Sequence, residues 1–333
     1  MEPVTDVREI SRIAYAFMAS KALFGALHLG LFDNLAKAPN DLEGLSAESG
    51  VAPNRLNSLL IALVSLGLLI KEEGRYANAP ATDRYLVRGQ PAYFGDYYTP
   101  QIDRLVYPKL DHFTPALTGE AVDGLYEHEF ADPEEAADFT IGQHAGSQGP
   151  AYMLARRVDL SGRRKLLDIG GGSGAFSLEI CRTNLEVTAT VLDFPNVVGY
   201  ADQFAADAGL GDRITTLAGN ALETDWPKDH DVVLMSYLLS AVPRPAVDAL
   251  LARAWSALPS GGLVLVHDFV INEAGTGPDL AALWYLPMML GNPDSSMLTE
   301  SELTGNLARL GFVEIDSEEL ISEITSLIIA RKP

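Results

Sequence analysis

The sequence predicts an α/β protein: a mostly helical first domain followed by a doubly wound parallel sheet. Three observations favour this fold class. Before residue 100, apolar residues recur every three or four positions, as they do in amphipathic helices. From residue 164 onward, short runs of apolar and β-branched residues alternate with helical stretches, which is typical of a parallel sheet covered by helices. The length of 333 residues is enough for two domains of ordinary size.

The first hundred residues follow the outline of a winged helix. Residues 7–37 are predicted to form two helices. In the stretch that follows, Ser46 and Pro53 lie near expected helix starts, and Gly67 and Gly74 mark the end of the last helix and the turn of the wing. The last helix, near residues 53–66, carries one basic residue, Arg55, and is otherwise largely apolar. A helix that reads a DNA groove needs polar and basic side chains, so we expect residues 1–100 to mediate dimerisation instead.

The composition points the same way. The chain carries 45 acidic and 24 basic residues, a formal net charge of −21, which works against binding to nucleic acid. No apolar run approaches the roughly 20 residues of a membrane span, and the N-terminus has no signal pattern. The single cysteine, Cys181, cannot form an internal disulfide. We therefore expect a cytoplasmic protein that binds neither nucleic acid nor membrane.

Residues 101–160 are predicted to form a helical connector, and residues 161–333 the sheet domain. The five predicted parallel strands, each separated from the next by a helical stretch, are 165–170, 189–194, 214–221, 231–237 and 261–270. The last two predicted strands, 312–320 and 325–333, lie too close for a helical crossover. They should therefore form an antiparallel pair at the edge of the sheet.

A glycine-rich run, DIGGGSG at residues 168–174, follows the first of these strands. Glycines allow the backbone to turn sharply and to approach a ligand closely. Dinucleotide enzymes use a similar loop for pyrophosphate, but the carboxylate of Asp168 would repel pyrophosphate and attract a cationic ligand derived from methionine. Asp193 ends the second strand, where a carboxylate suits the ribose of either kind of nucleotide. The loop therefore favours a methyltransferase over a dehydrogenase.

The segments LLDIGGGSGAFSLEI, VLDFPNVV and LAGNALE resemble the nucleotide motifs of class I S-adenosylmethionine-dependent methyltransferases. Residues 8–332 as a whole resemble the plant-type and bacterial small-molecule O-methyltransferase family, which joins a winged-helix dimerisation domain to a Rossmann-type domain. The resemblance implies S-adenosyl-L-methionine as the cofactor and a homodimer formed through the N-terminal domain. It also implies a small-molecule acceptor, such as a phenol of secondary metabolism.

The resemblance also assigns cofactor contacts. The amino-acid end of the cofactor would lie against three glycines and an acid of the loop, namely Gly170, Gly172, Gly174 and Asp168. The adenosine would contact residues that follow the next three strands, namely Asp193 at the ribose, Phe194, Asn220 and Ala221 at the adenine, and Ser236. The family more often has Asp at the position of Asn220.

The catalytic pattern of the family is broken in this chain. O-Methylating members have a His after the fourth strand that deprotonates the acceptor hydroxyl, and here that position is Ser240. Three residues could replace it: His267 and Asp268 at the end of the fifth strand, and His144 before the sheet domain. They could act as a base with an orienting acid, or together bind a divalent metal. Asp268 matches the family's orienting acid.

Loss of the usual base leaves several reactions open. The acceptor atom could be oxygen, carbon or nitrogen, and the main alternative is metal- or His-assisted C-methylation of a 2-oxo acid. A repurposed relative that transfers no methyl group, a winged-helix regulator and a nicotinamide-dependent oxidoreductase compete less well. The acceptor pocket is predicted from apolar and aromatic residues on a helix near residue 284 and from the stretch after the fourth strand, namely Trp284, Tyr285, Met288, Met289, Tyr237 and Ser240.

Overall fold

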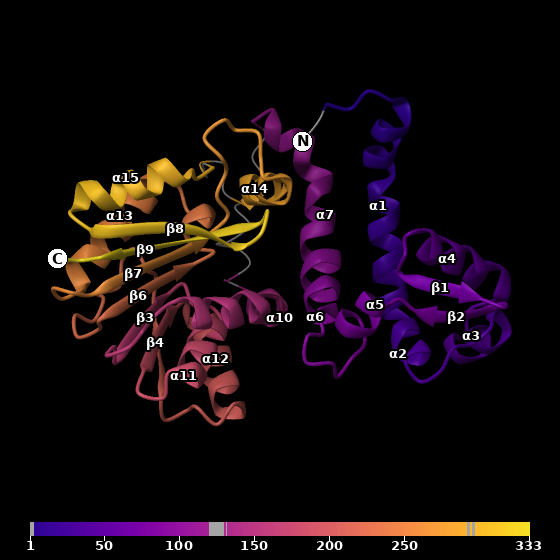
Figure 1. Cartoon of the computed structure of the whole chain (residues 1–333), viewed down its shortest axis with the longest axis horizontal. Helices are drawn as coiled ribbons and strands as arrows, with labels where there is room; N and C mark the ends of the chain where they lie inside the picture. The colour runs from indigo at the N-terminus through magenta and orange to yellow at the C-terminus, as the bar shows by residue number, and fades with distance from the viewer. Residues whose placement is uncertain (1–2, 120–129, 131, 292–293, 295–296) are drawn as a thin grey trace. The chain divides into compact units, whose positions relative to one another are not determined.

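The computed structural model describes residues 3–119, 130, 132–291, 294 and 297–333. The chain divides into two compact units, Met1–Arg104 and Leu105–Pro333 (Figure 1). None of the helices in these described ranges combines the length and apolar character that a membrane span requires.

The first unit is built from short helices and a two-stranded antiparallel hairpin. Its elements are α1 (Val7–His28), α2 (Leu31–Leu35), α3 (Leu42–Ser49), α4 (Pro53–Ser65), β1 (Leu69–Glu72), β2 (Arg75–Asn78), α5 (Pro80–Tyr85) and α6 (Gly95–Tyr97). Leu56, Leu60 and Leu63 of α4 are fully buried, since residues three or four apart share one face of a helix. Gly67 after α4 and Gly74 in the hairpin turn both have positive φ, as the predicted wing requires.

A run of helical segments connects this unit to the sheet domain. It comprises η1 (Tyr98–Val106, a π-helix), α7 (Tyr107–Lys109), η2 (Leu110–His112), α8 (Phe113–Leu117) and α10 (Pro133–Arg157). Asp132 begins α10, because its carboxylate accepts hydrogen bonds from the backbone N–H groups of Glu134 and Glu135. Residues 101–117 and 133–157 are helical, and the role of 101–160 as a connector that contributes to the acceptor pocket stays a prediction.

The second unit contains a seven-stranded sheet in the order β5-β4-β3-β6-β7-β9-β8. Its strands are β3 (Lys165–Ile169), β4 (Thr188–Asp193), β5 (Ile214–Ala218), β6 (Val232–Ser236), β7 (Leu263–Asp268), β8 (Val313–Ile321) and β9 (Thr325–Arg331). The first five are parallel, and β9 runs antiparallel to both β7 and β8. The predicted strand set and the antiparallel pair at the edge are confirmed.

Helices cover both faces of this sheet (Figure 1). One face packs on α10, α11 (Ala175–Thr183) and α12 (Pro195–Asp207), and the other on α13 (Arg244–Ala257) and α15 (Glu300–Leu310). The 3₁₀ turn η3 (Leu239–Ala241) follows β6, and α14 (Asp279–Gly291) follows β7. Strand residues alternate between the two faces, so Asp168 and His267 point to the α11 side.

The connection between β5 and β6 contains no helix, contrary to the prediction of a helical stretch after each strand. Residues 219–231 form turns and loop instead, with Pro227 near the end and the Trp226 ring inserted into the core. A proline removes a backbone donor and breaks the ladder of a helix. The face of the sheet near β5 is therefore left partly uncovered.

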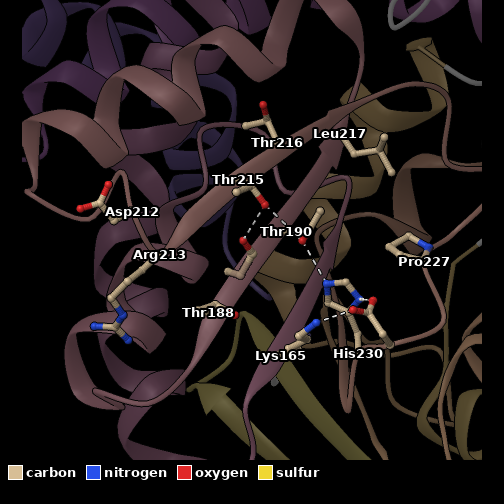
Figure 2. Close-up of a pocket in the computed structure, with 12 residues that line it drawn as sticks. Lys165, Thr188, Thr190, Asp212, Arg213, Thr215, Thr216, Leu217, Pro227 and His230 are labelled. Atoms are coloured by element: carbon tan, nitrogen blue, oxygen red, sulfur yellow. Dashed lines mark hydrogen bonds and ion pairs between the residues drawn. The ribbon is translucent and has the colours of Figure 1, made fainter.

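A hollow of about 500 Å³ lies on this uncovered face, at the amino ends of β3, β4 and β5 (Figure 2). Its polar side chains bond mainly to one another. Thr190 contacts the hydroxyl of Thr215 at 3.3 Å and Nε2 of His230 at 3.0 Å, and Lys165 pairs with Asp229. The hollow therefore lies at the opposite end of the strands from the glycine loop.

Candidate active site

The predicted site residues converge at the carboxyl ends of the parallel strands. Asp168 is the penultimate residue of β3, Asp193 ends β4, Ser236 ends β6 and Asp268 ends β7. Ligands of open α/β sheets bind at this edge, because loops that leave neighbouring strands there can open a crevice. The register of the parallel ladder brings β3 between β4 and β6, so the glycine loop lies at the centre of this edge.

The glycine loop has the backbone conformation that its sequence predicts. Gly170, Gly172 and Gly174 have φ of +65°, +56° and +72°, a left-handed region that other residues adopt only with strain. A Cβ on Gly170 would lie 3.0 Å from Cδ1 of Leu238, whereas a Cβ on Gly172 would meet nothing within 4 Å. The backbone at Gly172 is therefore open to a ligand on the outer side of the loop.

Asp168 carries a buried oxygen without a partner. Its Oδ2 accepts a hydrogen bond from Oγ of Ser177 at 2.7 Å, while no hydrogen bond reaches Oδ1. Burial raises the pKa of Asp168 to about 7, although the bond from Ser177 acts in the opposite direction. An unsatisfied buried acceptor is unfavourable, and a cationic ammonium group would relieve it. Asp168 therefore fits the ammonium end of S-adenosylmethionine.

Asp193 shapes the same loop. Its Oδ2 accepts a hydrogen bond from the backbone N–H of Gly172 and its Oδ1 from that of Phe194, both at 2.7 Å. Burial raises the pKa of Asp193 to about 6. A carboxylate oxygen has lone pairs for more than one donor, so these bonds leave capacity for a ribose hydroxyl. Ribose binding by Asp193 stays a prediction.

The three residues predicted at the adenine all have contacts within the chain. The Phe194 ring lies 5.3 Å from the Phe130 ring, measured between centroids. The side chain of Asn220 accepts a hydrogen bond from the backbone of Leu222, and the carbonyl of Ala221 accepts one from the Trp226 indole. These contacts hold the loops after β4 and β5, and contact with adenine stays a prediction.

His267 is enclosed in the sheet. Its Nδ1 lies 2.8 Å from Oγ of Ser236 and its Nε2 lies 2.9 Å from Oγ1 of Thr325. The ring has no exposed surface, and burial lowers its pKa to about 3. Both nitrogens are therefore already bonded inside the protein. These bonds do not favour a role as a base or metal ligand, and such a role for His267 stays a prediction.

Asp268 and Ser240 form a closed pair on the other face of β7. The Ser240 hydroxyl donates to Oδ1 of Asp268 at 2.5 Å, and the Ser240 backbone N–H donates to Oδ2 at 3.1 Å. The backbone N–H of Phe269 also donates to Oδ1, at 2.8 Å. Neither side chain of the pair is exposed, and burial raises the pKa of Asp268 to about 6. Asp268 thus holds the η3 turn, and a role in orienting a base stays a prediction.

His144 lies at the glycine loop, on α10. Its Nδ1 is 2.9 Å from Oγ of Ser173, and its ring stacks on Phe204 of α12 with a centroid distance of 3.7 Å. Burial lowers the pKa of His144 to about 4, assisted by the charge of Arg182. His144 is therefore neutral near pH 7 and braces the loop from outside the sheet. A catalytic role for it stays a prediction.

The predicted metal set is not formed. In the part of the chain that the structure describes, no three His, Cys, Asp or Glu side chains are grouped to hold an ion. His144 bonds to Ser173, whereas His267 and Asp268 point to opposite faces of β7 and bond elsewhere. These three residues therefore do not make a joint metal site.

An apolar cluster lies at the ends of β6 and β7 against α14. It gathers most of the predicted pocket residues, and its members include Tyr237, Phe269, Trp284, Tyr285 and Met288. The Trp284 ring stacks on Phe269 at 5.6 Å, and Tyr237 lies 5.1 Å from Phe269. The Tyr285 hydroxyl donates to the carbonyl of Phe269 and accepts from the backbone of Leu298, so it ties α14 to β7. Met289 is partly exposed and lies outside this cluster.

Four residues at the site were missed in the sequence. Ser173 and Ser177 contact His144 and Asp168, Thr325 contacts His267, and Leu238 lies under Gly170. Ser177 could have been found, because it is a polar residue on the apolar face of the helix that follows the loop. Thr325 could not, because its position depends on the register of the antiparallel strands.

The sheet order, with β9 inserted antiparallel beside β7, and the glycine loop above a buried acid define a class I methyltransferase. Comparison of the sequence with protein families supports this class. The model of the O-methyltransferase domain matches residues 112–313, and that of the O-methyltransferase dimerisation domain matches residues 11–88. The chain belongs to this O-methyltransferase family, and it is an S-adenosylmethionine-dependent methyltransferase with a family dimerisation domain.

Individual relatives span nearly the whole chain. The 3-hydroxy-5-methyl-1-naphthoate 3-O-methyltransferase of Streptomyces sahachiroi is 32% identical over 96% of this chain and 94% of that protein. The N,N-dimethyltransferase OxyT of Streptomyces rimosus is 32% identical over 100% of this chain and 98% of that protein. The crystal structure of human N-acetylserotonin methyltransferase with S-adenosylmethionine has a TM-score of 0.85 at 26% identity, covering 100% of this chain and 99% of that one.

Proposed function

We propose that this chain is a homodimeric enzyme that transfers the methyl group of S-adenosylmethionine to a hydroxyl oxygen of a small aromatic metabolite. The observation that carries the proposal is the unpaired buried oxygen of Asp168 beside a glycine loop that is open at Gly172. Membership of the O-methyltransferase family and the naphthoate relative support oxygen as the methylated atom. The 2-oxo acid alternative loses its support, because His144, His267 and Asp268 form no metal site.

Residues at β3 and β4 would bind the cofactor, and residues at β6, β7 and α14 would bind the acceptor. Asp168 and the glycine loop would hold the amino-acid end of the cofactor, and Asp193 its ribose. The cofactor supplies an electrophilic methyl group when bound. The apolar cluster at Tyr237 and Trp284 would exclude water and hold a flat acceptor against that methyl group. Alignment of two reactants in this way supplies a large part of the rate enhancement in such transfers.

We further propose three segments with separate tasks, and a dimer formed through the first. Residues 1–100 would dimerise, 101–160 would contribute to the acceptor pocket, and 161–333 would bind the cofactor. The apolar side chains of Ile10, Ile13 and Phe17 follow one face of α1, and each is at least half exposed. An apolar stripe on the surface of a single chain favours association. A cytoplasmic location and the absence of nucleic-acid binding stay predictions.

The function is tested by calorimetric titration with S-adenosylmethionine, followed by transfer of an isotopically labelled methyl group to a panel of phenols, amines and 2-oxo acids. We expect micromolar cofactor binding and label on a phenol oxygen. Parallel titrations with NADH and with a mixed-sequence DNA duplex should give no heat. Binding of NADH or DNA in place of S-adenosylmethionine would refute the proposal in favour of an oxidoreductase or a regulator.

The dimer is tested by light scattering after size-exclusion chromatography of the Ile13→Glu variant. A charge within an apolar contact should convert the dimer to a monomer, because its desolvation costs several kcal/mol. Glu48→Gln, on the exposed surface of α3, serves as a control that should stay dimeric. A wild-type protein that is monomeric at micromolar concentration would contradict the proposed assembly.

A further inference from the structure

Among the residues that the structure describes, the side chains at the ends of β6 and β7 offer no free proton acceptor. A phenol hydroxyl loses its proton on methylation, so an O-methyltransferase must either remove that proton or receive the acceptor without it. The nearest polar pair, Ser240 and Asp268, is closed: the Ser240 hydroxyl donates its own proton to the carboxylate. Further backbone donors to Asp268, from Ser240 and Phe269, occupy the carboxylate.

A proton relay from the acceptor through Ser240 to Asp268 would need Ser240 to touch the acceptor. Both side chains have 0% exposed surface, so an acceptor oxygen cannot reach them without opening the η3 turn. That turn is held by the same bonds that would carry the proton. The pair therefore has the geometry of a structural brace and not of a base.

The other titratable groups around this end are bonded or, in the case of Tyr237, held in the protonated form by burial. His267 uses both ring nitrogens, on Ser236 and Thr325. The Tyr285 hydroxyl is bonded to the backbone on both sides of α14, and burial raises the pKa of Tyr237. His144 bonds to the glycine loop instead of lying at β6 and β7. Within the described ranges, no carboxylate or imidazole at the ends of these two strands is left to accept a proton.

The surroundings favour a flat aromatic acceptor. The Phe269 ring, at the end of β7, lies within 6 Å of both the Tyr237 ring and the Trp284 ring. Such rings pack well on another planar ring. A phenolate that enters beside them also gains from the positive charge of the sulfonium, because opposite charges attract strongly where water is excluded.

We infer that the acceptor is an acidic phenol or enol, conjugated with an electron-withdrawing carbonyl, which enters the site as its anion. This inference rests on the proposed function. The acceptor loses its proton to the solvent before the transfer. The phenolate oxygen then attacks the methyl carbon, a carbon–oxygen bond forms, and the carbon–sulfur bond breaks with its electron pair moving to sulfur. The products are a methyl ether and neutral S-adenosylhomocysteine, and the enzyme exchanges no proton in this step.

The test compares acceptors that have the same shape and different acidity. One pair is 4-hydroxybenzaldehyde, whose carbonyl acidifies the hydroxyl, and 4-methylphenol, with a pKa of about 10. A second pair is 4-hydroxy-1-naphthaldehyde and 4-methyl-1-naphthol, which makes the same comparison for a pocket that takes a larger, two-ring acceptor. We expect kcat/KM at pH 7.5 to favour the aldehyde by about a hundredfold, because a simple phenol is ionised to only a few parts per thousand at that pH. The inflection of the pH profile should move with the pKa of the acceptor.

Three results would overturn the inference. A profile with one fixed inflection for all acceptors would mean that the enzyme supplies a base, and its disappearance in Ser240→Ala would identify the relay to Asp268. Equal turnover within each pair would remove the dependence on acidity. If only amines were methylated, the acceptor would be an amine and not a phenol or an enol. Failure of the proposed function is distinguished by calorimetry, since a protein that does not bind S-adenosylmethionine fails before any acceptor is added.

Discussion

The buried acids of β3 and β7, two strands on either side of β6, differ in their hydrogen bonding. At β3, Asp168 keeps one oxygen buried and unpaired beside an open glycine loop. At β7, both oxygens of Asp268 accept hydrogen bonds, from the Ser240 side chain and from backbone donors. Both acids are buried, and burial raises the pKa of each. The difference lies in whether the protein itself supplies the hydrogen-bond partners.

This difference suggests that the cofactor and the acceptor would be recognised by different physical interactions. An acid without a protein partner is stabilised by a cationic ligand, so the β3 end selects its ligand by charge. Asp268 already has protein donors on both oxygens, so its charge does not attract a ligand. Selection of the acceptor near β7 would instead depend on the shape of the aromatic cluster. On the proposed function, the enzyme would bind its cofactor through electrostatics and its acceptor through packing.

The largest expected effect comes from Asp168→Asn. An amide cannot form the charge-assisted bond to the cofactor's ammonium, so we expect the Kd for S-adenosylmethionine to rise about a hundredfold. Calorimetric titration at pH 7.5 measures it. Asp207→Asn, on the exposed surface of α12, changes the net charge equally and should leave the Kd within twofold.

Asp168→Asn should not weaken the fold. The folded pKa of Asp168, about 7, lies above its unfolded value of about 4. The stability that this group contributes is therefore present below pH 4 and is lost as the pH rises through 7. At pH 8 the free energy of unfolding of the variant should equal or exceed that of the wild type. A strongly destabilised variant would mean that the weaker binding reports unfolding.

The next effect tests the hydrogen-bonded residues of β7. Thr325→Val keeps the shape of a side chain that is 2% exposed but removes the hydroxyl bonded to Nε2 of His267. The imidazole nitrogen is then buried without a partner, so urea denaturation should show a loss of about 2 kcal/mol in the free energy of unfolding. Thr188→Val, on the exposed start of β4, should change it by less than about 0.5 kcal/mol. Equal losses in the two variants would mean that the bond between Thr325 and His267 contributes no more to the free energy of unfolding than an exposed hydroxyl does.

A smaller effect follows from pH. On the proposed function, the cofactor's ammonium would bind the ionised form of Asp168, and the pKa of this acid is about 7 without ligand. Affinity for S-adenosylmethionine should therefore fall roughly tenfold between pH 7.5 and pH 6. In Ser177→Ala the loss of the hydrogen bond to Asp168 should move the midpoint to higher pH. A midpoint that does not move would assign the titration to another group, such as Asp193.

The smallest effect concerns the open loop. Gly172 and Gly209 have φ of +56° and +69°, and a Cβ on either would meet nothing within 4 Å. Alanine at each position should cost about 1 kcal/mol of stability, because left-handed backbone strains a residue with a Cβ. Only Gly172→Ala should also weaken cofactor binding, by several-fold, since its methyl group would occupy the ligand's side of the loop. Equal affinities in the two variants would place the cofactor elsewhere.

Much of the fold followed from the sequence, because its signals are local. Strand β3 with its glycine loop and the wing turn at Gly74 are marked by residues next to one another in the chain. The prediction of a helix between β5 and β6 was wrong. The alternation of strands and helices elsewhere in the domain favoured a helix there, and the single helix-breaking residue, Pro227, was the only local signal against it. Local patterns describe a regular fold well and its exceptions poorly.

The site was less predictable than the fold. The position of Asp168 follows from its strand, but the closure of His267 depends on Thr325, 58 residues away, through the pairing of β9 with β7. The β8–β9 pairing that fixes this edge contains two register shifts, and a shift of one residue reverses the face to which each side chain points. The residues next to His267 in the sequence therefore did not indicate whether its imidazole would be free or hydrogen-bonded.

The contact between Gly170 and Leu238 limits how this enzyme could be redesigned. Leu238 lies in the stretch that leads to Ser240, and its Cδ1 would lie only 3.0 Å from a Cβ on Gly170. Mutagenesis aimed at new acceptors can vary the exposed side of α14, at Leu283 and Leu286, without disturbing the glycine loop. Changes at Leu238 alter both ends at once, so libraries for new substrates should leave this position fixed.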